Sequence, residues 1–78
     1  MRSLAPPGTA ETIVVTVNGE PHLVTAGATA HDVVAALGCE GRPLAVEVNE
    51  SVVPRASLAG CMLADGDRLE IVTLVGGG

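Results

Sequence analysis

The stretch TIVVTVNGEPHLVTAGATAHDVVAALG, residues 12–38, contains two hydrophobic periods in succession. Along residues 12–18 the apolar side chains alternate, which predicts a strand with one apolar face. That face is formed by Ile13, Val15 and Val17. Asn18-Gly19 then favours a hairpin turn, and a second strand is predicted near residues 21–25. The first half of the stretch therefore predicts a β-hairpin.

The second half, residues 29–38, has the period of a helix. Thr29 can cap the helix N-terminus, and Asp32, three residues later, can complete a capping box. Apolar residues at i, i+3, i+4 and i+7 are predicted to face the core: Ala30, Val33, Val34 and Leu37. Gly38 is suited to end the helix in a left-handed conformation. The hairpin is therefore followed by one short amphipathic helix.

Further strand signals follow the helix. Residues 44–49, LAVEVN, alternate again and place three apolar side chains on the core face: Leu44, Val46 and Val48. A short strand is predicted at Val52-Val53, and Pro54 limits it to a sheet edge or ends it. The turn DGD, residues 65–67, leads into the last strand, residues 68–75. The order is strand, strand, helix, strand, short strand, strand.

This order predicts an α+β fold in which a mixed sheet of four to five strands packs on one helix. A helical crossover requires a parallel strand pair, so we expect the first and last strands to lie side by side and parallel. Residues 12–75 then form the domain. Residues 1–11 contain two prolines and a glycine and are predicted to be a flexible leader, and residues 76–78 a flexible glycine tail.

Composition limits the classes of function. The chain has 78 residues, enough for one small domain, and contains no Phe, Tyr or Trp, so its core must be aliphatic. Four arginines, no lysine and nine acidic residues give a net charge of −5, which disfavours nucleic acid and suits a basic protein partner. Without a long apolar run or a signal-peptide pattern, we expect no membrane contact and a cytoplasmic location.

The residues with catalytic or metal-binding chemistry form no recognisable motif. His22 and His31 have no serine or cysteine spaced to form a triad with them, and Cys39 and Cys61 match no CxxC spacing. The pair of aspartates at residues 65–67 lacks the remaining ligands of a calcium loop. We therefore predict no catalytic residue, no metal ligand and no cofactor bound by this chain.

The sequence ends in Gly76, Gly77 and Gly78. Phosphate-binding glycine loops lead into a helix, and no helix follows here, so this is not a nucleotide site. Two interpretations remain: a floppy tail or cloning remnant, or an arm that carries the Gly78 carboxylate into a partner's active site. Three extended glycines reach about 10 Å and, lacking Cβ atoms, can pass through a narrow channel. In the second interpretation the carboxylate would attack a phosphate of ATP.

The last strand also predicts a docking patch. If its inward positions are Leu69, Ile71, Thr73 and Val75, the outward positions are Val72 and Leu74. We expect both to lie near the outward-facing Val14 of the neighbouring strand. Exposed apolar residues beside a tail indicate a surface for a partner, unless a loop or a dimer partner covers them.

Three segments together resemble the ThiS family of sulfur carrier proteins: VNG at residues 17–19, AVEVNESVVPR at 45–55 and DGDRLEIVTLVGGG at 65–78. The resemblance covers residues 12–78 and implies the ubiquitin-like β-grasp fold. It implies that a ThiF-type enzyme adenylates the Gly78 carboxylate with ATP, and that the carboxylate becomes a thiocarboxylate. The sulfur would pass to thiazole synthase, ThiG, for the thiazole of thiamine.

By the same resemblance Gly77 is the penultimate glycine and Gly76 an additional one. ATP, magnesium and a sulfur donor such as a cysteine desulfurase system would belong to the partners, and the chain would be their co-substrate. Other functions remain open: a sulfur carrier for molybdopterin or cysteine biosynthesis, a protein modifier attached through its terminus, or a non-covalent adaptor that binds through the patch.

Overall fold

The computed structural model describes residues 11–74. The predicted leader, apart from Glu11, and the predicted tail with Val75 lie outside the described residues. The elements in chain order are β1 (Thr12–Val17), β2 (Glu20–Thr25), α1 (Ala30–Ala36), β3 (Leu44–Val48), β4 (Ser51–Val53), a 3-10 helix η1 (Arg55–Gly60) and β5 (Arg68–Thr73). The predicted order of strands and helix is confirmed, with β4 ending immediately before Pro54.

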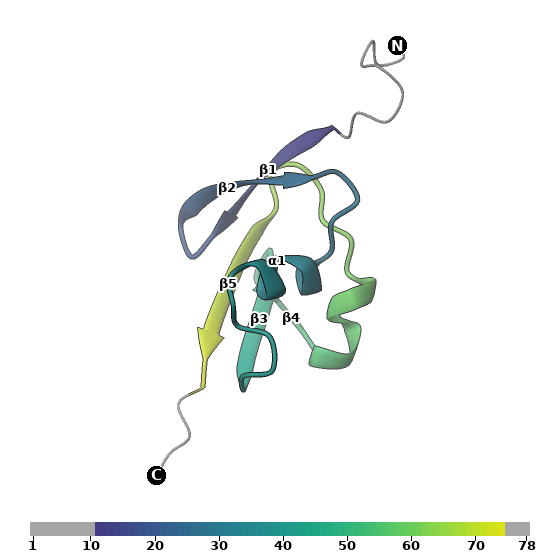
Figure 1. The fold of residues 1–78 in the computed structure, drawn as a ribbon. Coiled ribbons are helices and arrows are strands. Elements are labelled where there is room, and N and C mark those ends of the chain that lie inside the picture. The colour runs from purple at the N-terminus through teal and green to yellow at the C-terminus, as the bar shows by residue number, and fades with distance from the viewer. Residues whose placement is uncertain (1–10, 75–78) are drawn as a thin grey trace.

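The described strands form one mixed sheet in the order β2-β1-β5-β3-β4, with α1 over one face (Figure 1). β1 and β2 form the predicted hairpin, in which Asn18 and Gly19 both have positive φ angles of 52° and 85°. β5, the last strand of the described residues, lies in the centre of the sheet, parallel to β1 and antiparallel to β3. The predicted parallel pairing of the first and last strands is therefore confirmed.

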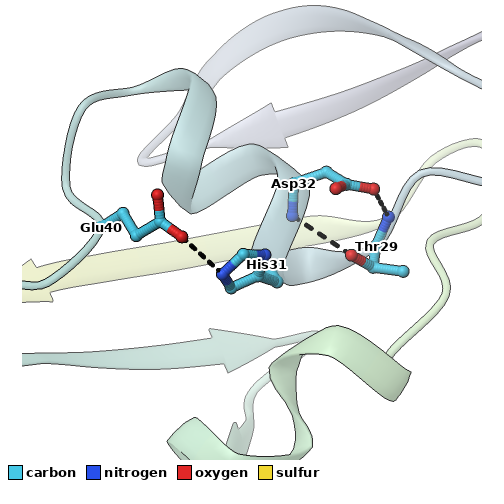
Figure 2. Close-up of polar contacts among 4 residues, drawn as sticks. All are labelled: Thr29, His31, Asp32 and Glu40. Carbon is cyan, nitrogen blue, oxygen red and sulfur yellow. Dashed lines mark hydrogen bonds and ion pairs between the residues drawn. The ribbon is translucent and has the colours of Figure 1, made fainter.

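Helix α1 begins with the predicted capping box (Figure 2). The Asp32 N–H donates to Oγ1 of Thr29 at 3.2 Å, and the Thr29 N–H donates to Oδ2 of Asp32 at 2.9 Å. Nε2 of His31 also lies 3.0 Å from Oε2 of Glu40, which joins the first turn of α1 to the loop after it (Figure 2). The capping box that the sequence pattern predicts is thus confirmed, and the contact between His31 and Glu40 is one that the pattern does not give.

The end of α1 differs from the prediction. Ala30, Val33 and Val34 are buried as expected, but Leu37 is 41% exposed. The helix ends at Ala36, and Leu37 is its C-cap with φ −85° and ψ 0°. Leu37 lies just past the last helical residue, so it belongs to the end of α1 and is not buried with Ala30, Val33 and Val34.

The core is aliphatic, as the composition predicts. Among the described residues the buried apolar side chains are Val15, Val17, Ala30, Val33, Val34, Val46, Val48, Leu58, Leu63, Leu69 and Ile71. Leu69, Val15 and Val46, from the three central strands, are the largest of those that are almost completely buried. Thr73, expected to point inward, is exposed because it is the last residue of β5 and lies past this cluster. The core therefore anchors the beginning of β5 more strongly than its end.

The start of β5 is held by Asn49, which follows β3 and has a left-handed φ of 51°. Its N–H donates to the Arg68 carbonyl at 2.7 Å, and its Oδ1 accepts from the Arg68 N–H at 3.0 Å. Its Nδ2 donates to Oδ1 of Asp67 at 3.0 Å. One asparagine thus joins the turn after β3 to the first residues of β5.

Candidate functional site

The candidate site is the end of β5, where the described part of the chain stops. Val72 and Leu74 are 57% and 53% exposed, and Ala45, which pairs with Val72, is exposed as well. The Leu74 N–H donates to the Pro43 carbonyl at 2.8 Å, so the ladder with the β3 side continues to this residue. An apolar surface therefore extends to the position from which the predicted tail continues. Gly76, Gly77 and Gly78 themselves lie outside the described residues.

Val14 does not belong to this surface. In the parallel register Thr16 pairs with Arg68, which places Val14 level with Gly66. The Gly66 N–H accordingly donates to the Val14 carbonyl at 2.8 Å. Val72 lies six positions after Gly66. At about 3.3 Å per position, it is therefore about 20 Å from the level of Val14 along the strand direction. The prediction that Val14 lies near Val72 and Leu74 is wrong.

The surroundings of Val14 are at the opposite end of the sheet. Its pairing partner on β2 is Leu23, which is 73% exposed, and its own N–H donates to Oδ1 of Asp65 at 2.8 Å. The alternation of β1 correctly places Val14 on the outer face. The register between β1 and β5 places Val14 far from the end of β5. Alternation does not specify this register.

Asn18 contacts the end of β5 from the β1 side. Its N–H donates to the Leu69 carbonyl at 2.9 Å. Its Oδ1 accepts from the Ile71 N–H at 2.8 Å, and its Nδ2 donates to the Ile71 carbonyl at 3.1 Å. Sequence reasoning assigns Asn18 only to the hairpin turn and misses these contacts. The sequence predicts that the strands carrying VNG and DGDRLEIV lie side by side, but it does not give the register that brings Asn18 to Ile71.

Arg55 contacts the loop on the other side of β5. Its Nη2 donates to the carbonyl of Arg42, and the next carbonyl, that of Pro43, accepts from Leu74. Arg55 is the first residue of η1, directly after Pro54. The segment VPR therefore supports the loop to which the end of β5 is bonded.

The outer face between β3 and β5 is acidic. Glu47 and Glu70 pair directly across the two strands, and Glu50 and Arg68 line the same shallow depression. Together with the net charge of −5, this arrangement favours approach to a partner with a basic surface.

The aspartates and cysteines that could in principle serve catalysis or metal binding make contacts within the fold. Asp67 accepts from the Ala64 N–H at 2.8 Å through Oδ2, as expected for a turn residue. Cys39 and Cys61 are free thiols that pack partly buried against the core. Within residues 11–74 no three potential metal-ligating side chains form a group, and no helix there is long and apolar enough to cross a membrane.

The described residues form a mixed sheet whose central strands β1 and β5 are parallel, and one α-helix lies on one face of it. The strand β5 ends in an apolar surface. Together these features define a ubiquitin-like β-grasp protein. Sequence comparison specifies the family within this class. The sequence pattern of the ThiS family matches residues 10–78 of this chain. The chain therefore belongs to the ThiS family.

Individual relatives agree with this assignment. The crystal structure of the thiamine biosynthesis protein (ThiS) from Geobacter metallireducens matches with a TM-score of 0.71 and 29% identity, covering 85% of this chain and 100% of that one. A thiazole synthase of Paramagnetospirillum magneticum is 42% identical over 62 residues, and one of Magnetococcus marinus 39% over 61. These matches cover 80% and 78% of this chain, which spans only 19% of the length of either synthase.

Proposed function

We propose that this chain is a sulfur carrier for the synthesis of the thiamine thiazole, with the Gly78 carboxylate as the group that carries sulfur. The observation that supports this most directly is the family match, which runs through Gly78. The relative from Geobacter metallireducens is a thiamine biosynthesis protein, and its fold covers 85% of this chain.

The proposed chemistry begins with the main-chain carboxylate. A Gly78 oxygen attacks the α-phosphorus of ATP, pyrophosphate leaves, and the carboxylate becomes an acyl adenylate. The terminal sulfur of a donor persulfide, such as that of a cysteine desulfurase system, then displaces AMP and forms an acyl disulfide. A thiol cleaves the S–S bond of this disulfide by attacking the donor's sulfur, which leaves a thiocarboxylate on the chain and a disulfide between the thiol and the donor. Because the reacting group is the end of the main chain, the carrier is a co-substrate, and ATP and magnesium are used by the activating partner.

Two partners follow from this proposal. A ThiF-type enzyme would adenylate Gly78, with Gly76 and Gly77 passing through its channel because they have no side chains. Val72 and Leu74 would dock on that enzyme, since exposed apolar residues next to the reacting end gain contact area on binding. The acidic face at Glu47 and Glu70 would steer the carrier toward a basic surface.

The second partner is thiazole synthase, which we propose as the acceptor of the sulfur. The similarity of this chain to 19% of the length of two proteins named thiazole synthase supports this pairing. A carrier domain and a synthase that act in succession gain effective concentration when they are joined in one chain. We propose that both steps occur in the cytoplasm, where ATP is available.

Intact-mass spectrometry tests the proposal. The full chain is incubated with a ThiF-type enzyme, ATP, magnesium and a sulfur donor, and we expect replacement of one oxygen by one sulfur in the C-terminal peptide. The enzyme's activity is verified on another carrier of the family. If the enzyme is active and this chain gains no sulfur, the carrier function is wrong.

The choice of pathway is tested with the thiocarboxylate form. We expect it to support thiazole formation by thiazole synthase. If it instead supplies sulfur only to molybdopterin or cysteine synthesis, the thiamine assignment is wrong although the carrier chemistry stands.

A further inference from the structure

β5 extends beyond the strand that pairs with it on one side. β1 ends at Val17, which pairs with Leu69, whereas β5 continues to Thr73. In Figure 1, β5 accordingly passes the β1–β2 hairpin on its way to the C-terminal end of the chain. From Ile71 onward the backbone of β5 therefore has no β1 backbone opposite it.

The side chain of Asn18 occupies the place of that missing backbone. In a parallel ladder each residue that faces its neighbour offers one N–H and one carbonyl. The Asn18 amide offers the complementary pair to Ile71, accepting from its N–H at 2.8 Å and donating to its carbonyl at 3.1 Å. Both hydrogen bonds are partly buried, so they compete weakly with water. Asn18 thus extends β1 by one residue through its side chain.

On the opposite side β5 pairs with β3 as far as Thr73, whose partner is Leu44, and one further hydrogen bond follows. There the Leu74 N–H donates to the Pro43 carbonyl at 2.8 Å. At Ile71 the Asn18 side chain therefore holds β5 from the β1 side, whereas the β3 side is paired continuously to Leu74. Without that side chain the end of β5 would be held from the β3 side alone.

From this geometry, and resting on the proposed carrier function, we infer that Asn18 is a positioning residue for the Gly78 carboxylate. Without the Asn18 contacts, residues 71–74 would be paired along one edge alone, so the direction of Leu74, from which the predicted tail continues, would vary more from molecule to molecule. Adenylation requires the carboxylate within bonding reach of the phosphorus, and misplacement by about 1 Å can cost two orders of magnitude in rate.

Asn49 provides a matched control for this inference. It is also an asparagine with a left-handed φ, 51° against 52° for Asn18, and its Oδ1 also accepts from the backbone N–H of a β5 residue. That residue is Arg68, at the start of the strand. Glycine tolerates this backbone conformation, so Asn18→Gly and Asn49→Gly each remove a side-chain clamp without straining the turn.

The experiment measures pyrophosphate release by a ThiF-type enzyme as a function of the concentration of full-length carrier. Loss of folded molecules alone raises the apparent KM and leaves kcat unchanged, because only folded carrier binds. We expect Asn18→Gly to lower kcat about tenfold with a smaller change in KM. Asn49→Gly should keep the wild-type kcat. Asn18→Asp, which keeps the acceptor for the Ile71 N–H, should recover part of the loss.

Amide hydrogen exchange provides a readout that needs no enzyme. Exchange at Ile71 should accelerate relative to Leu58 in Asn18→Gly and remain unchanged relative to Leu58 in Asn49→Gly. Equal kcat in the two glycine variants, or equal exchange at Ile71, would overturn the inference. If wild-type carrier reacts normally while the variants do not differ, only the role of Asn18 is wrong. If wild-type carrier does not react with a demonstrably active enzyme, the proposed function is wrong and the inference falls with it.

Discussion

The two ends of β5 belong to one strand but differ in how they are held. Around Arg68 and Leu69 the strand has backbone partners on both sides, and Leu69 is almost completely buried. At Val72 and Leu74 the side chains are exposed, and β1 has already turned away. The difference indicates that the start of β5 stabilises the fold, whereas its end is available for a partner. Each of the following predictions separates these two roles.

Deletion of Gly77 and Gly78 should give the largest effect on function. The variant still ends in a carboxylate, that of Gly76, but its chain is shorter by about 7 Å when extended, so the carboxylate should not reach the partner's active site. We therefore expect no thiocarboxylate to form, while the thermal unfolding midpoint stays unchanged. Intact-mass spectrometry and circular dichroism measure the two properties. An adaptor that binds through its surface would instead keep partner binding and activity, which would contradict the carrier function.

Leu69→Ala should give the largest effect on stability. Leu69 is among the largest fully buried side chains, and truncating a buried leucine to alanine costs about 2 to 5 kcal/mol in the free energy of unfolding. Urea titration measures this loss. Leu74→Ala, at the other end of the strand, should cost less than about 0.5 kcal/mol because the side chain is largely exposed. Similar losses for both variants would remove the distinction between the two ends.

Leu74→Asp should weaken binding to the activating enzyme by about tenfold or more, because a carboxylate would enter an apolar contact. The fold should be retained, as judged by the unfolding midpoint. Leu23→Asp is the control, since Leu23 is also an exposed leucine but lies on β2 opposite Val14. Isothermal titration calorimetry measures both affinities. Unchanged affinity for Leu74→Asp would exclude Leu74 from the interface.

Gly66→Ala should give a smaller effect, confined to the start of β5. Gly66 has a φ of +90° and no heavy atom within 4 Å of an added Cβ, so the cost comes from the backbone alone. We expect a loss of about 1 to 2 kcal/mol in the free energy of unfolding. Chemical denaturation measures this loss, and kcat for adenylation should stay at the wild-type value. A lower kcat would mean that the start of β5 also orients the reacting end.

What could be predicted from the sequence depends on how far apart the contacting residues are. The capping box of Thr29 and Asp32 spans three positions, and residue type at that spacing specifies it. The parallel pairing of β1 and β5 follows from the helical crossover, although the contacts are distant in sequence. Periodicity also places Val14 and Val72 correctly on the outer face.

The sequence does not predict two kinds of feature: the register between distant strands and the residue at which the helix ends. Val14 was predicted to lie near Val72 because alternation gives the face of a residue but not its position along the neighbouring strand. The contact of Asn18 with Ile71 spans 53 positions, and the same asparagine is already explained by its turn. Leu37 was expected in the core because the apolar period continues for one residue after the helix ends.

The central place of β5 also has a consequence for how the protein is made. Strands β1 and β3 lie on either side of β5, so the sheet cannot close until the last strand has been synthesised. A chain that is interrupted before β5, or cut within it, lacks the middle of its own sheet and the core residue Leu69. Such a fragment lacks the exposed apolar surface at the end of β5. If the chain acts as the proposed carrier, a fragment of this kind would therefore not compete with the complete carrier for its activating enzyme. Completion of the fold and presence of the C-terminal strand are thereby coupled during biosynthesis.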